Sequence, residues 1–357
     1  MPTRVIDLGL PQLNQPAKLI LTDGLRQSYL ALSYCWGEGT KHCTELRREN
    51  IATLMVSIDE RELSKTHRDA FQLARSLHYR YIWIDALCIV QQEIADWEFE
   101  SRRMADVYGN AALTIVAGRA RDSRDGFLEN PWTPASGPCA IPYSKRTPSD
   151  CGEGTQNRAM GNVLVSLRRS RETGPTDSRG WCFQEAVLST CLIVYGKEQM
   201  YFQCQKGRIW EDGAEEDGDR FSVRSSLRAW PSSLVSTSAV DSISDEQTSN
   251  SDTAKPAGNL RGHVLNQWYQ NVVSPFSRRQ LTMPHDCFAA IASLAKLVQI
   301  QVHSRYLAGL WEDNIVSGLL GLLLAQIAEN KFRRLGHFVV ACEWWILEGE
   351  EQELTLV

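Results

Sequence analysis

Residues 81–84 read Tyr-Ile-Trp-Ile, a continuous apolar run that stops at Asp85. A short run without polar alternation is typical of a strand that is covered on both faces. Two comparable runs occur elsewhere in the first third of the chain, at residues 29–34 (YLALSY) and 112–117 (ALTIVA). Together the three runs predict the central strands of one sheet.

Between these strands the spacing of apolar residues changes to that of helices. From Thr66 to His78 apolar residues recur at intervals of three and four, and we expect Thr66 to cap this helix with Asp69 at the capping-box position. A second helix is expected from about Asp96 to Tyr108. Strands that alternate with helices predict an α/β fold with a mostly parallel sheet flanked by helices.

The second half of the chain has further elements of both kinds. We expect a helix at residues 180–188, a strand pair at 192–195 and 200–203, and helices near 262–274 and 284–301. A stretch rich in Ser, Thr and Asp between them cannot bury enough apolar surface to offset the entropy of ordering. The predicted division is a first domain at 1–215, an acidic and Ser-rich disordered linker at 216–260, and a helical C-terminal region at 261–357.

Composition excludes several functional classes. The 357 residues carry a net charge of −5, so no basic excess favours nucleic acid or an anionic membrane surface as a partner. The N-terminus lacks an apolar signal segment, and the apolar stretch at 315–328 is too short to span a bilayer. The ten cysteines form no C-x-x-C pair, so we expect reduced thiols, no metal site and a cytoplasmic protein.

Three long motifs occur in a characteristic order. They are YLALSYCWG at 29–37, RYIWIDALCIVQ at 80–91 and RGWCFQEAVLS at 179–189, followed by Arg-Arg at 278–279 and a YLAGLW segment at 306–311. This set resembles the fungal heterokaryon incompatibility (HET) domain. The resemblance implies a role in self/non-self recognition and programmed cell death, with partners that are further copies of the chain or another incompatibility protein.

HET domains are distantly similar to Toll/interleukin-receptor (TIR) domains, which implies a TIR- or flavodoxin-like core. The similarity places Trp97 and Glu100 where enzymatic TIR domains carry a W-x-x-E motif. In those domains the glutamate serves hydrolysis of the nicotinamide–ribose bond of NAD through an oxocarbenium-like state. The resemblance therefore implies Glu100 as the catalytic residue and NAD as a substrate, with no cofactor, and leaves open whether this chain is an enzyme.

The residues themselves give Glu100 two interpretations. On a helix it shares one face with Trp97, Met104 and Val107, at the edge of an apolar stripe. A buried carboxylate needs a partner or a cleft. It is either a structural ion pair, with Arg103 or Arg80, or a catalytic or ligand-binding group.

Apart from Trp97, which belongs to the W-x-x-E motif, the predicted ligand-binding residues lie where two strands end. Ligands of open α/β sheets bind at the carboxyl ends of the parallel strands, where Asp85 follows one strand. The alternative for Asp85 is a turn or helix-capping residue. The predicted ligand-binding set comprises Ser33, Tyr34, Cys35, Trp36, Gly37, Asp85 and Trp97.

Two polar residues in the third motif are expected to have a structural role. Gln184 and Glu185 lie among large apolar residues, where polar side chains usually satisfy buried backbone groups. Two other functions remain open from the sequence. The chain could be a recruited enzyme of fungal secondary-metabolite biosynthesis, or an interaction module without catalysis.

Overall fold

The structure is a computed structural model of the 357-residue chain. It describes residues 1–10, 15–37, 44–129, 139–145, 159–165, 171–217 and 262–319 apart from 263, 266 and 317.

Within these residues the main element is a nine-stranded sheet with the order β11-β10-β9-β8-β5-β3-β4-β1-β2. Its strands are β1 Arg4–Asp7, β2 Lys18–Leu21, β3 Tyr29–Ser33, β4 Tyr81–Trp83, β5 Leu113–Val116, β8 Leu192–Tyr195, β9 Met200–Cys204, β10 Gly207–Trp210 and β11 Glu215–Asp217. Two separate pairs are β6 Cys139–Lys145 with β7 Ala159–Val165, and β12 Tyr306–Leu307 with β13 Leu310–Trp311.

The sheet is mixed, which corrects the expectation of a mostly parallel sheet. Only its centre is parallel: β3 pairs in parallel with β4 and β5, and β5 with β8. The strands on both flanks pair antiparallel. Tight connections such as those between β8, β9 and β10 can only produce antiparallel neighbours, because a parallel pair needs a long crossover.

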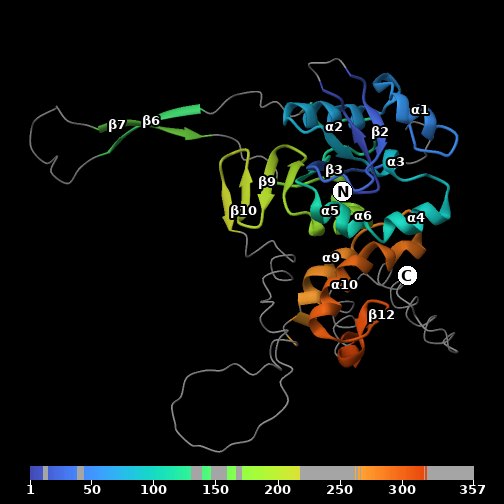
Figure 1. Cartoon of the computed structure of the whole chain (residues 1–357). Coiled ribbons are helices and arrows are strands. Elements are labelled where there is room, and N and C mark those ends of the chain that lie inside the picture. The colour runs from blue at the N-terminus through green and yellow to red at the C-terminus, as the bar shows by residue number, and fades with distance from the viewer. Residues whose placement is uncertain are drawn as a thin grey trace, which may run out of the picture.

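Helices cover both faces of the parallel centre (Figure 1). Figure 1 shows α2 on one side of the sheet and α5 and α6 on the other, with α9 and α10 beyond them. All five residues of β3 are buried, as expected for a strand covered on both faces. The α-helices are α1 Ile51–Val56, α2 Lys65–Ser76, α3 Asp85–Cys88, α4 Ile94–Ser101, α5 Met104–Asn110, α6 Gly180–Leu188, α9 Ser274–Ser277 and α10 Ala289–Val302.

The start of α2 differs from the sequence expectation. Ser64 is its N-cap and accepts a hydrogen bond from the backbone N–H of His67. Asp69 does not complete a capping box; its carboxylate accepts the backbone N–H groups of Phe127 and Leu128 at 2.7 and 3.1 Å. Asp69 thus fixes a loop almost sixty residues away, which no local pattern indicates.

The single helix expected from Asp96 to Tyr108 is two helices. The turn between α4 and α5 lies at Arg102 and Arg103. No proline or glycine marks this break, and the helical spacing of apolar residues continues across it, so the sequence pattern predicted one helix. The helix predicted at 180–188 is confirmed as α6.

The C-terminal elements pack against α6. A π-helical turn, η7 (Tyr269–Val273), runs into α9, and α10 packs against both α5 and α6. The predicted linker at 216–260 and most of the apolar stretch at 315–328 fall outside the described residues, so the predicted division into domains stays a prediction.

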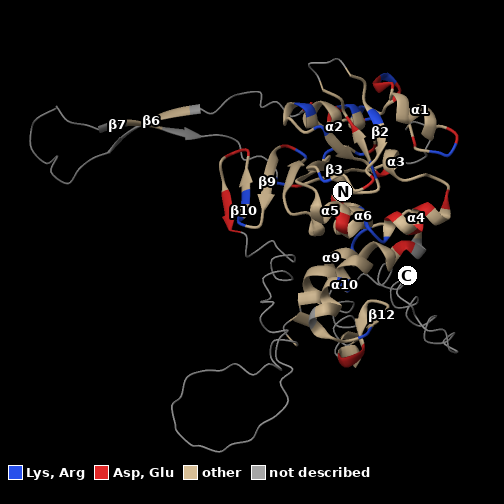
Figure 2. Cartoon of the chain, in the orientation of Figure 1, with Lys and Arg blue, Asp and Glu red and all other residues tan. Residues whose placement is uncertain are grey.

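Charge is dispersed over the described elements. Figure 2 shows Lys and Arg interspersed with Asp and Glu, with an acidic run on β11. In the part of the chain that the structure describes, every helix is too short or too polar to cross a bilayer.

Candidate functional site

Glu100 lies buried beside an arginine from the start of the chain. Its side chain is 2% exposed, and its Oε1 lies 3.3 Å from the guanidinium of Arg4. The same guanidinium makes a closer ion pair with Asp96, at 2.6 Å, and donates to the backbone carbonyl of Cys88 at 2.7 Å. One arginine therefore compensates two carboxylates and joins β1 to α3 and α4.

The partners suggested for Glu100 from the sequence are engaged elsewhere. Arg103 donates to Thr3 Oγ1 at 2.7 Å, and Arg80 forms a two-bond ion pair with Asp7. The arrangement of Glu100 corresponds to the structural interpretation, but with Arg4 as the partner. A contact between positions 4 and 100 depends on the tertiary fold, so no helical spacing could identify it.

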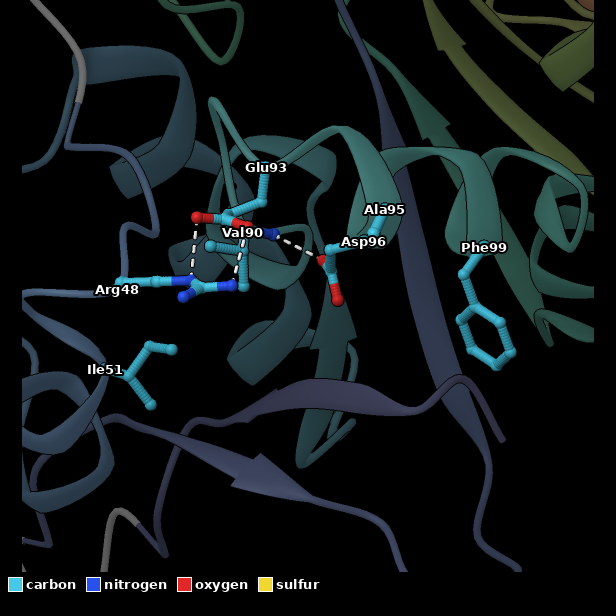
Figure 3. A pocket seen from close by; sticks show the side chains of 7 residues that line it. All are labelled: Arg48, Ile51, Val90, Glu93, Ala95, Asp96 and Phe99. Carbon is cyan, nitrogen blue, oxygen red and sulfur yellow. Dashed lines mark hydrogen bonds and ion pairs between the residues drawn. The ribbon is translucent and has the colours of Figure 1, made fainter.

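A pocket of about 450 Å³ opens beside α4 (Figure 3). The residues that line it are Arg48, Ile51, Val90, Glu93, Ala95, Asp96 and Phe99. Arg48 and Glu93 form an ion pair of 2.7 Å, and Asp96 accepts the backbone N–H of Val90. Glu100 is absent from this lining, so the pocket does not give it access to a ligand.

Trp97 lies on the partly exposed side of α4. Its side chain is 38% exposed, and its ring meets the ring of Trp181 edge-on, with centroids 6.3 Å apart. Trp181 in turn donates to the carboxylate of Asp286 at 3.3 Å. Trp97 therefore contacts α6 rather than the ends of the strands.

The other predicted ligand-binding residues converge at the carboxyl edge of β3 and β4. The indole N–H of Trp36 donates to Asp85 Oδ2 at 2.8 Å, and the backbone N–H of Ala86 donates to Asp85 Oδ1 at 2.7 Å. Ser33, Tyr34 and Cys35 are buried at the end of β3, whereas Trp36 and Asp85 are partly exposed. Asp85 is thus an acidic residue at this edge that is not fully buried.

Gly37 is required by the backbone at this edge. Its φ is +97°, and a Cβ there would lie 2.5 Å from the Cβ of Asp122. Only glycine combines this left-handed conformation with such a close approach. Gly37 therefore shapes the rim and has no side chain to contact a ligand.

Glu185 also lies near this edge, although its sequence context predicted only a structural role. It lies on α6, is 5% exposed, and neighbours Asp85, Ser33 and Tyr108. Burial raises the pKa of Glu185 to about 7, and the charge of Asp85 adds to the rise. Among the described residues, its Oε2 and both amide atoms of Gln184 have no hydrogen-bond partner. The side chain of Gln184 therefore makes none of the expected bonds to buried backbone within the described residues, whereas hydrogen bonds from Ser33 and Tyr108 oppose the rise in the pKa of Glu185.

Asp85 has a different environment from Glu185. Burial raises the pKa of Asp85, while hydrogen bonds from Trp36 and Ala86 and the nearby charge of Arg179 act in the opposite direction. Donors on both carboxylate oxygens favour the ionised form. Burial thus raises the pKa of both carboxylates, and hydrogen bonds and the charge of Arg179 oppose the rise in each.

The other reactive groups at this edge are held neutral. Burial raises the pKa of Cys35 to about 11 and that of Cys182 further, so neither thiol is an activated nucleophile. Burial lowers the pKa of His67, which packs edge-on against Tyr34, to about 3. Burial thus places the pKa of Glu185 close to neutral pH, unlike those of these thiols and of His67.

Residues beyond the third motif hold α6 in place. Arg279 donates to the backbone carbonyls of Thr176 and Arg179 at 3.1 and 3.0 Å, and its guanidinium stacks over the ring of Phe183. Gly180 at the start of α6 donates its N–H to the carbonyl of Gln280. These contacts fix the helix that carries Glu185.

In the described residues no group of three or more His, Cys, Asp or Glu side chains is placed to bind a metal ion. Free thiols are found at Cys35, Cys88, Cys182, Cys191, Cys204 and Cys287.

Comparison with known proteins identifies the segment that contains this edge. Residues 29–185 match the family described as Heterokaryon incompatibility protein (HET). The chain is 32% identical over 111 residues to heterokaryon incompatibility protein 6, OR allele, of Neurospora crassa; the aligned stretch covers 29% of this chain and 16% of that protein. No solved structure matches. From residue 29 to residue 185, the chain therefore carries a fungal heterokaryon incompatibility (HET) domain.

Proposed function

We propose that this chain acts in fungal self/non-self recognition and that its HET domain causes programmed cell death by hydrolysing NAD. The observation that carries the proposal is the carboxyl edge of β3 and β4, where the partly exposed residue Asp85 lies among Ser33, Tyr34 and Trp36. Open α/β sheets bind ligands at this edge. The distant similarity of HET to TIR domains suggests NAD, and this step is an analogy of fold.

The proposal does not depend on Glu100. The TIR resemblance nominates this residue, but its ion pair with Arg4 favours a structural role. The Glu100→Gln variant separates the two roles, because a structural residue alters stability while a catalytic one alters turnover.

Two measurements test the function. The full chain is expressed from an inducible promoter in a filamentous fungus, with Asp85→Asn as the comparison and Asp23→Asn, in a turn far from the edge in sequence, as the control. We expect growth arrest with the wild type and the control, and normal growth with Asp85→Asn.

Purified wild-type protein at high concentration should release nicotinamide from NAD. Normal growth with the wild type, or no nicotinamide, would contradict the cell-death or the NAD part respectively.

A non-enzymatic interaction module is the second candidate. It is favoured by the exposed apolar side chains of α4, where Ile94 is 76% and Phe99 is 52% exposed beside the pocket of Figure 3. Its partner would be another copy of the chain or another incompatibility protein. Under this candidate, growth arrest persists in Asp85→Asn and is lost when Ile94 and Phe99 are replaced by Ser.

A further inference from the structure

Two acidic residues from separate parts of the chain lie near the carboxyl edge of β3 and β4, close enough to influence each other electrostatically. Asp85 begins α3, directly after β4, and Glu185 lies on α6, which packs against β3 and α5. Since β3 and β4 are parallel neighbours, their carboxyl ends lie at one edge. The helix packing then brings Glu185 within electrostatic range of Asp85.

We propose that Asp85 and Glu185 are the reactive pair of this domain, with Asp85 as the anion that faces the ribosyl centre of NAD and Glu185 as the base that accepts the proton of the attacking water. This inference rests on the proposed function and specifies the residues that perform it. It assigns to Glu185 a role that neither the sequence motif nor the TIR analogy indicates.

The environments of the two carboxylates separate their roles. Both oxygens of Asp85 accept N–H hydrogen bonds, which oppose the rise in its pKa that burial causes, and the residue is partly exposed. Glu185 is 5% exposed and has an oxygen without a hydrogen-bond partner in the described chain. A base works best when its pKa lies near the working pH, which holds for Glu185.

The reaction balances with these two groups and one water. The bond between C1′ of the ribose and the nicotinamide nitrogen breaks, and its electron pair leaves with neutral nicotinamide. The positive charge that develops at C1′ is stabilised by the anion of Asp85. The water oxygen bonds to C1′, its proton passes to the Glu185 carboxylate, and that proton is then released to solvent. The products are ADP-ribose, nicotinamide and one proton, and no acid catalyst is needed for the leaving group.

The pH dependence follows from the groups that face Glu185. Those with charge are Asp85 at the start of α3, Arg179 before α6 and Arg279 before α10. The neutral groups are the hydroxyls of Ser33 and Tyr108 and the thiols of Cys35 and Cys182. Because the base must be ionised, turnover should rise as pH rises through about 7. Removal of the charge of Asp85 should move the Glu185 titration to lower pH.

The test compares full-length wild type, Glu185→Gln, Asp85→Asn and the control Glu98→Gln, whose side chain is 52% exposed on α4. Nicotinamide release from NAD is measured from pH 5 to pH 9, and thermal melting verifies the fold. We expect a loss of at least about 100-fold for Glu185→Gln with an undiminished melting temperature. Glu98→Gln should remain within about twofold. Asp85→Asn should lose turnover and shift its residual profile to lower pH.

Failure of the pair and failure of the NAD proposal give different results. If Glu185→Gln keeps wild-type turnover and pH profile, the pair is overturned while NAD hydrolysis stands. If wild type releases no nicotinamide, NAD hydrolysis is overturned, and the pair is decided by carboxyl-carbon NMR of protein labelled at Glu. A carboxyl that titrates near pH 7, is lost in Glu185→Gln and moves to lower pH in Asp85→Asn supports the coupled pair. Absence of that carboxyl overturns it.

Discussion

Two of the places where the described chain buries a carboxylate differ in how the negative charge is compensated. Behind α4, Asp96 and Glu100 share the guanidinium of Arg4, at 2.6 and 3.3 Å. At the edge of the parallel strands, Glu185 is buried to a similar degree and lies next to a second carboxylate, Asp85. The first arrangement joins elements together, whereas the second keeps a proton exchangeable near neutral pH. Burial alone therefore does not identify a functional acid, because the charge of the neighbouring group determines whether the acid is paired or has a raised pKa.

The largest expected effect is on stability, from the loss of the shared cation. Arg4→Ala leaves Asp96 and Glu100 without their cation and should destabilise the fold by about 3–5 kcal/mol. The measurement is the free energy of unfolding in urea. The control is Arg48→Ala, since Arg48 is 72% exposed and its pair with Glu93 should contribute no more than about 1 kcal/mol. Equal losses of stability in Arg4→Ala and Arg48→Ala would contradict the view that Arg4 stabilises the fold more than the exposed ion pair does.

Glu185→Gln should stabilise the protein increasingly as pH rises from 4.5 to 7, with the full effect above pH 7. The pKa of Glu185 is about 7 in the folded chain, against an ordinary value of 4.5, so folding favours the protonated form. Stability that is present below pH 4.5 is lost as pH rises through 7, and glutamine avoids this loss. We expect the variant to exceed wild type by roughly 2–3 kcal/mol at pH 8 and by little at pH 4. A difference in urea midpoint that is equal at both pH values would contradict a titrating Glu185.

Glu100→Gln should have a smaller effect. Arg4 keeps its closer partner Asp96, so the expected destabilisation is about 1 kcal/mol. Nicotinamide release, where wild type shows it, should stay within about twofold. If Glu100→Gln abolishes release while Glu185→Gln retains it, the roles of the two regions are reversed and the TIR analogy holds residue by residue.

The smallest effect on stability is expected at the surface of α4. Phe99 is 52% exposed, so Phe99→Ser should change the free energy of unfolding by no more than about 0.5 kcal/mol. If α4 binds another copy of the chain, the same variant should lower the sedimentation coefficient at high protein concentration. An unchanged sedimentation coefficient would show that the exposed side of α4 does not form a contact between copies of the chain.

The apolar runs of the sequence predicted the centre of the fold well. The runs at 29–34, 81–84 and 112–117 became β3, β4 and β5, because a strand covered on both faces must be apolar throughout. The strands β1 and β2 and the break between α4 and α5 were not predicted. Short strands carry too little periodicity, and the break has no proline or glycine to mark it.

For the site, the sequence placed Ser33, Tyr34, Trp36 and Asp85 at one sheet edge, and the structure brings them together there. It did not single out Glu185, although a signal was present. A lone carboxylate in the apolar helix sequence GWCFQEAVL has a cost of burial that only a partner or a function explains.

The sequence by itself determined the central strands, helix α6 and the HET motifs, because local apolar pattern and fixed motif residues act over short stretches of chain. Only the tertiary structure decided which carboxylate is paired. Arg4 reaches Glu100 across 96 positions, and α6 brings Glu185 to Asp85 across one hundred. Electrostatic environment depends on distance in space, and a linear pattern does not contain it.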